Sequence, residues 1–85
     1  MSGSGKPKKY NRVPADKTEF ETAVVTAVKQ LRIAGLNHVK QRDICIECGW
    51  EYTESTINRI GFVFRNTLHL TRRCRCVYCI AEVPA

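Results

Sequence analysis

Residues 41–60 read QRDICIECGWEYTESTINRI, and this stretch decides how the chain folds. Its first half places an isoleucine and two cysteines on one side of a short helix, which we expect over residues 40–48. Gly49 follows directly and is suited to end that helix in the left-handed conformation. Thr53 is a good N-cap for a further helix. The centre of the chain therefore predicts a short helix, a glycine turn and a second helix.

The helix that opens at Thr53 is amphipathic. Its apolar residues are spaced 3, 7 and 11 positions apart, so they share one face, while Gly61 weakens the helix locally. That face consists of Ile57, Ile60, Phe64 and Leu68, and Val63 widens it.

Upstream, residues 18–34 predict the longest helix of the chain. Thr18 and Glu21 match a capping box, and Gly35 is placed to terminate the helix. An apolar stripe runs along it at helical spacing. The stripe consists of Phe20, Ala23, Val24, Ala27, Val28 and Leu31.

Downstream, residues 72–83 are rich in Cys, Val, Tyr and Ile and predict a strand that Pro84 ends. Its partner strand is expected at residues 67–70 or 35–39. The sequence thus predicts one α+β domain, mostly α, over residues 17–85. Residues 1–16 are rich in Gly, Ser, Pro and Lys and predict a flexible basic tail.

The order of helix, short helix, glycine turn, helix and strand resembles the helix-turn-helix and winged-helix families of nucleic-acid-binding proteins. The resemblance implies a three-helix, winged-helix-like domain with a small C-terminal β element. It also implies that the third helix enters the major groove of DNA. On that helix Ser55, Asn58, Arg59 and Asn66 suit base edges, and Arg65 suits a phosphate.

Positive charge is concentrated at the two ends of the chain. The net charge is +6, with +4 in residues 1–17, −2 in residues 18–57 and +4 in residues 58–85. Two basic groups are therefore expected to contact phosphates. They are Lys6, Lys8, Lys9 and Arg12 in the tail, and Arg72, Arg73 and Arg75 near the C-terminus. An ordinary solubilising tail and a charged sheet edge would have the same composition.

The cysteines allow two interpretations. Two C-x-x-C pairs can grip one tetrahedral zinc ion, which predicts Cys45, Cys48, Cys76 and Cys79 as ligands of one structural zinc. In the other interpretation they are small buried apolar residues and there is no cofactor.

The sequence leads to one main functional hypothesis: a transcription-regulatory module that binds double-stranded DNA. One alternative is a protein-interaction module that modulates a larger machine, such as RNA polymerase or a repressor, through residues such as Trp50 and Phe62. A second is a zinc-stabilised scaffold. Neither His38 nor His69 has a catalytic partner in the pattern, so no enzyme is expected. With no apolar run of membrane length and no secretory signal, we expect a cytoplasmic or nucleoid-associated protein that binds no membrane.

Overall fold

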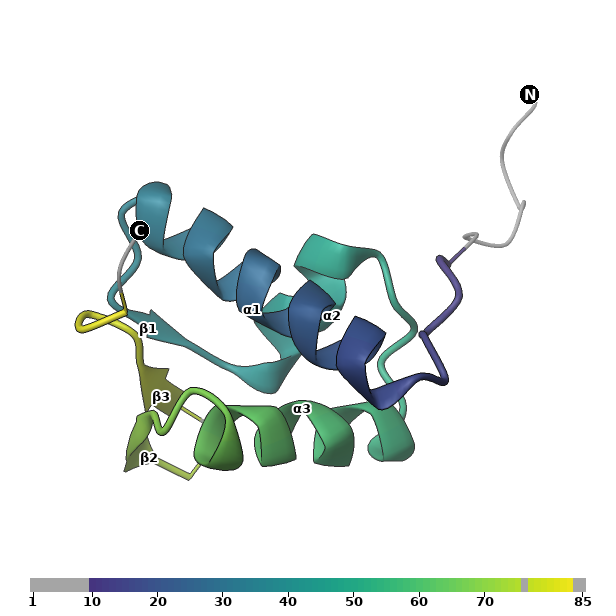
Figure 1. The fold of residues 1–85 in the computed structure, drawn as a ribbon. Helices are drawn as coiled ribbons and strands as arrows, with labels where there is room; N and C mark the ends of the chain where they lie inside the picture. The colour runs from purple at the N-terminus through teal and green to yellow at the C-terminus, as the bar shows by residue number, and fades with distance from the viewer. Residues whose placement is uncertain (1–9, 76, 84–85) are drawn as a thin grey trace.

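A computed structural model describes residues 10–75 and 77–83 (Figure 1). The elements follow one another as α1 (Lys17–Ile33), β1 (His38–Val39), α2 (Gln41–Cys48), α3 (Glu54–Asn66), β2 (Thr71–Cys74) and β3 (Val77–Cys79). The described part is a small α+β domain, mostly helical, in which three helices pack beside a three-stranded antiparallel sheet. This agrees with the fold class predicted from the sequence. Lys6, Lys8, Lys9, Cys76 and Pro84 lie outside the described residues.

The predicted capping box at Thr18 is wrong, because α1 begins one residue earlier. Asp16 is the N-cap, and its carboxylate accepts a hydrogen bond from the Glu19 backbone N–H at 3.0 Å. Asp16 and Glu19 have the same spacing of cap and acidic residue as Thr18 and Glu21. The sequence alone is therefore compatible with either residue as the N-cap. At the other end Gly35, with a φ of +100°, follows the last turn as predicted.

The central stretch folds as the sequence predicts. Helix α2 ends at Gly49, whose φ of +72° lies in the left-handed region. Helix α3 is capped by Thr53, whose hydroxyl accepts the Thr56 backbone N–H at 3.2 Å. Between them Trp50 is buried and its ring stacks on Phe20, with ring centres 5.0 Å apart. The turn between α2 and α3 is therefore anchored in the core.

The C-terminal segment is a hairpin and not the single strand predicted over residues 72–83. Strand β2 ends at Cys74 and β3 begins at Val77, and neither Gly nor Pro marks the turn between them. Strand β3 is central in the order β1-β3-β2, and β1 supplies the partner predicted within residues 35–39. The alternative partner, residues 67–70, is wrong, because these residues connect α3 to β2 and His69 there has a φ of +52°.

The core lies where the three helices meet the inner face of the sheet. Tyr78 of β3 is the sheet's main contribution, and its ring packs against Phe64 of α3 with ring centres 4.8 Å apart. The predicted stripes of α1 and α3 supply most of the rest, although Ala23, Leu31 and Leu68 are only partly buried at its margin. The predicted α3 face is wrong at two positions: Ile57 is only partly buried and outside the core cluster, and Leu68 lies beyond the end of α3. The buried core residues are Phe20, Val24, Ala27, Val28, Val39, Ile44, Cys45, Trp50, Ile60, Val63, Phe64, Tyr78 and Ile80.

Candidate nucleic-acid interface

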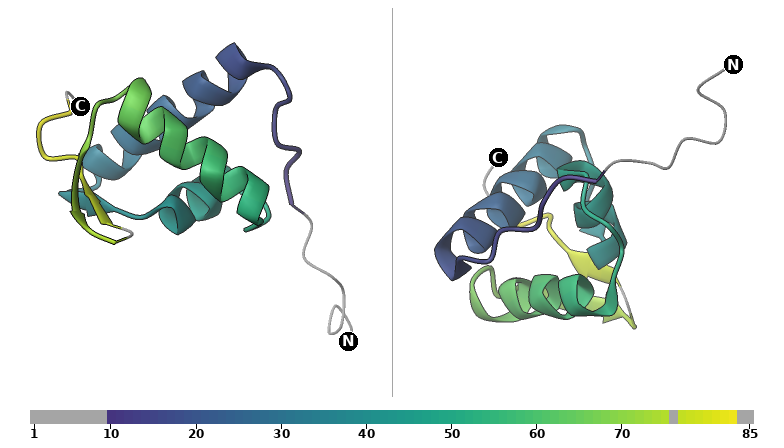
Figure 2. Two further views of the ribbon diagram at one scale, coloured as in Figure 1. Left: turned by 90° about the horizontal axis from the view of Figure 1, so that it is seen from below. Right: turned by 90° about the vertical axis from the view of Figure 1, so that its right-hand side faces the viewer.

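The outward face of α3 is a single exposed stripe. Ile60, Val63 and Phe64 point into the core, so residues at helical spacing on the other side remain accessible to solvent. Viewed from below, α3 lies in front of the other helices (Figure 2, left). The stripe consists of Ser55, Asn58, Phe62, Arg65 and Asn66.

Three of the predicted base-reading and phosphate-binding residues already have partners within the protein. The Arg59 guanidinium lies over the Phe20 ring, 4.0 Å from its centre, and Arg59 is half-buried. The Asn66 amide donates to the Phe62 carbonyl oxygen at 3.0 Å. The Arg65 guanidinium folds back over Gly61, where an added β-carbon would lie 3.2 Å from it. Ser55 and Asn58, the other two residues of the predicted set on this helix, are exposed.

The β2–β3 hairpin places its arginines beside the C-terminal end of α3. Arg72, Arg73 and Arg75 are all exposed. Arg72 pairs with Tyr78 in the sheet register, and directly opposed residues of antiparallel strands share a face. Arg72 is therefore on the side of the hairpin that faces α3, because Tyr78 packs on Phe64. Figure 2 (left) shows the hairpin and α3 side by side.

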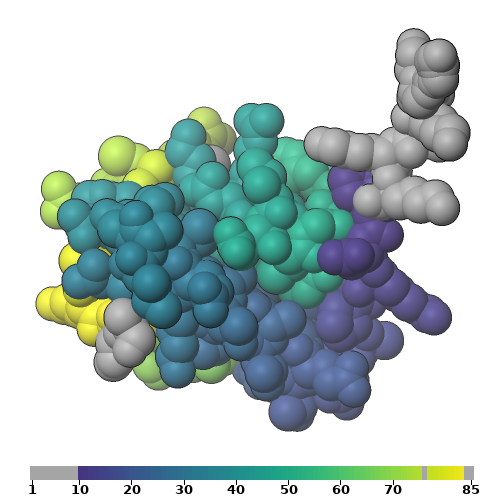
Figure 3. Space-filling view, turned by 90° about the horizontal axis from the view of Figure 1, so that it is seen from above, coloured from purple at the N-terminus to yellow at the C-terminus, as the bar shows by residue number. Residues whose placement is uncertain are grey.

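The inner part of the predicted tail is bound to the domain. The Asn11 backbone N–H donates to the Gly49 carbonyl oxygen, and its side-chain amide donates to the Cys48 carbonyl oxygen, both at 2.7 Å. Val13 packs against the core. Figure 3 shows this segment lying against the surface of the α2–α3 region. Residues 11–13 of the predicted tail therefore contact the domain, and Arg12, next to Asn11, is exposed beside the turn that leads into α3.

The same region carries exposed acidic residues. Glu47, Glu51 and Glu54 are all exposed around the α2–α3 turn. A carboxylate repels a phosphate, so this turn is an unfavourable place for a nucleic-acid backbone. At the hairpin, exposed Glu82 lines one hollow with Arg73, so carboxylates lie close to both basic regions.

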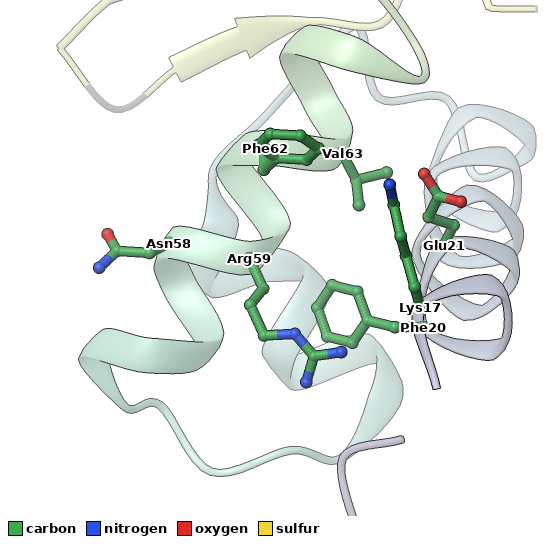
Figure 4. A pocket seen from close by; sticks show the side chains of 7 residues that line it. All are labelled: Lys17, Phe20, Glu21, Asn58, Arg59, Phe62 and Val63. Atoms are coloured by element: carbon green, nitrogen blue, oxygen red, sulfur yellow. The ribbon is translucent and has the colours of Figure 1, made fainter. Parts of the chain in front are cut away.

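A shallow groove of about 410 Å³ runs between the first turn of α1 and the outward face of α3 (Figure 4). Phe20, Phe62 and Val63 make its apolar surface, and Lys17 and Arg59 supply positive charge. The Lys17 ammonium lies 5.8 Å from the centre of the Phe62 ring. Lys17 was counted in the positive charge of residues 1–17 and was not predicted as a site residue. Its position next to Phe62 depends on how α1 packs on α3, which residue spacing does not reveal.

The described cysteines do not gather into a metal centre. Cys45 and Cys48 lie in α2, whereas Cys79 lies in β3 opposite His38. Among residues 10–75 and 77–83 no three His, Cys, Asp or Glu side chains form a group that could hold a metal ion. Burial raises the pKa of the Cys45 thiol. Burial is also the main cause that raises the pKa of the Cys48 thiol to about 11. Both shifts oppose the thiolate that zinc requires. Cys76 is outside the described residues, so the zinc site stays a prediction.

The comparisons with known proteins give no relative. No family model, no curated protein and no solved structure matches this chain. Within the described residues, no helix combines the length and apolar character needed to cross a membrane. The functional argument therefore rests on the geometry of the interface alone.

Proposed function

We propose that this chain is a winged-helix-like module that binds double-stranded DNA and regulates transcription without catalysing a reaction. In this arrangement α3 is the recognition helix and the β2–β3 hairpin is the wing. The element order and the sheet order β1-β3-β2 support it, because they place a two-stranded hairpin directly after the third helix.

One observation carries the proposal: exposed arginines on the hairpin lie beside an exposed polar helix face. Arg72 on the α3 side of the hairpin is suited to a phosphate, while Ser55 and Asn58 are free to approach base edges. Arg12 provides a further cation near the other end of α3. In this proposal the arginines at the two ends of the interface provide the affinity for DNA, and α3 provides any selection between bases.

Binding of a labelled duplex, followed by fluorescence anisotropy at about 50 and 200 mM salt, tests the proposal. The expected result is an affinity that falls at least tenfold at the higher salt, because bound cations release condensed counterions. The affinity should also survive in excess zinc chelator. Absence of binding at low salt, or binding indifferent to salt, contradicts the proposal.

A specific surface favours protein binding as a second candidate function. The exposed apolar residues Tyr10, Ile46 and Tyr52 line one hollow of about 380 Å³ on the α2 side. Glu47 and Glu51 stand near it in the chain, which suits a basic partner. Trp50, the anchor first expected for such a partner, is buried. Amide chemical shifts that respond to a lysine-rich, tryptophan-containing peptide at Ile46 and not at Asn58 would support this candidate.

A further inference from the structure

The groove between α1 and α3 combines a partly exposed aromatic ring, Phe62, with the Lys17 ammonium 5.8 Å from the centre of that ring. Phe62 lies in the middle of the outward stripe of α3, and 47% of its surface is exposed. A polar side chain would cost less at such a position, since exposed phenylalanine leaves apolar surface in water. The groove beside it is mostly apolar and has room for a planar ring (Figure 4).

We propose that this groove binds one unpaired nucleobase, stacked on Phe62, with the adjoining phosphate held by Arg59. The inference rests on the proposed function, which it sharpens from duplex DNA in general to DNA with a base outside the helical stack. Every nucleobase has a π-face, so stacking on an aromatic side chain does not require a particular sequence.

Arg59 is prepared for an anion by the way it packs. Its guanidinium lies over the Phe20 ring, 4.0 Å from the centre, and this contact favours the conformation that it adopts. Stacking uses the flat face of a guanidinium, whereas its N–H groups lie in the guanidinium plane and point outward from its edge, away from the ring. These edges can donate two parallel hydrogen bonds to a phosphate.

The other charged residues of the groove define where the phosphate goes. The Glu21 carboxylate accepts a hydrogen bond from the Thr67 hydroxyl at 2.7 Å and would repel a phosphate at that end. Lys17 lies on the same side of the groove as Glu21 (Figure 4). The phosphate is therefore placed at Arg59, and Lys17 adds general attraction. Asn58 lines the outer margin of the groove and is exposed, so a duplex can still reach it.

The shape of the groove favours an unpaired base over a paired one. The groove is a recess between two helices, whereas the base edges of a duplex lie at the floor of its own grooves. The recessed surface of the protein groove cannot reach base edges that are themselves recessed in the duplex. A base that protrudes from the stack can enter the protein groove. Extruding a base is least costly where it is already unpaired.

The test compares three labelled duplexes by fluorescence anisotropy: one fully paired, one with a single-thymidine bulge, and one with a single abasic bulge. The two bulges bend the duplex in similar ways, and only one offers a base. We expect the protein to bind the thymidine bulge about tenfold more tightly than the abasic bulge. This corresponds to about 1.4 kcal/mol, within the range for one base stacked on an aromatic side chain.

Variants locate the effect. Phe62→Ala should remove the difference between the two bulges, and Phe62→Trp should keep it, because tryptophan also offers a flat π-face. Ile33→Ala is the matched control, since Ile33 is an exposed apolar residue at the C-terminal end of α1, away from the groove. Thermal unfolding of each variant, followed by circular dichroism, verifies that the fold persists.

Each outcome separates the inference from the function on which it rests. Equal affinity for the two bulges, with salt-dependent duplex binding intact, overturns the inference alone. Failure to bind any of the three duplexes at low salt overturns the proposed function. An acidic peptide of alternating Glu and Leu that shifts the Phe62 amide resonance, combined with equal affinity for the two bulges, assigns the groove to a protein partner and also overturns the inference.

Discussion

The side-chain amide of Asn11 occupies the space that a β-carbon on Gly49 would need. An ideal β-carbon at Gly49 would lie 2.6 Å from Asn11 Nδ2. The amide makes this approach to donate to the carbonyl oxygen of the neighbouring Cys48. One glycine thereby ends α2 and fixes the segment that leads to the basic residues of the N-terminus.

Replacing Gly49 by alanine should destabilise the domain and release this segment. The φ of +72° costs an L-residue about 1–2 kcal/mol, and displacing the Asn11 amide adds to that cost. Urea unfolding measures the loss. In an Asn11→Ala background the same substitution should cost less, because only the backbone part remains. An equal loss in the two backgrounds would show that the Asn11 tether is unimportant, because the backbone cost is common to both.

The cap of α3 offers a second test of stability. Thr53→Ala should lower the free energy of unfolding by about 1 kcal/mol, because the Thr56 backbone N–H loses its acceptor. The Thr53 hydroxyl also contacts the hydroxyl of buried Thr56 at 2.9 Å. Thr53→Ser keeps the oxygen and should stay close to the original protein in the same urea titration. Equal losses for the two variants would argue against the cap.

The buried thiol of Cys48 predicts a loss of stability in alkali. Its pKa is raised from 9.0 to about 11, chiefly by burial and further by Cys45 and Glu47. The folded state favours the neutral thiol. The contribution of Cys48 to the free energy of unfolding is therefore complete below pH 9 and is lost as the pH rises towards 11. The urea midpoint under reducing conditions should fall over this range, and it should fall less in Cys48→Ala. Cys74→Ser, at an exposed position, is the control and should follow the original protein.

The helices were predictable from the sequence because their signals are local. The apolar stripe of α1, the left-handed Gly49 and the Thr53 cap depend on residues within one or two turns of each other. The α1 boundary was misplaced because Asp16 and Thr18 are both good caps, and only the path of the preceding chain selects between them.

The β element and the groove were less predictable because they depend on contacts distant in sequence. The turn after Cys74 contains no glycine or proline, so the sequence predicts one strand where the structure has a hairpin. The stacking of Arg59 on Phe20 joins residues of α1 and α3 that residue spacing cannot bring together. The predicted zinc ligands were chosen by spacing alone, and the described ones are divided between α2 and β3.

The central claim is that hairpin arginines beside α3 bind DNA phosphates, and the salt dependence of affinity tests it most directly. The slope of log K against log salt should become shallower by about 0.9 in Arg72→Gln, the loss of one phosphate contact on duplex DNA. Lys29→Gln, which removes the same charge from the exposed side of α1, should leave the slope unchanged. Equal slopes for Arg72→Gln and the original protein would contradict the account.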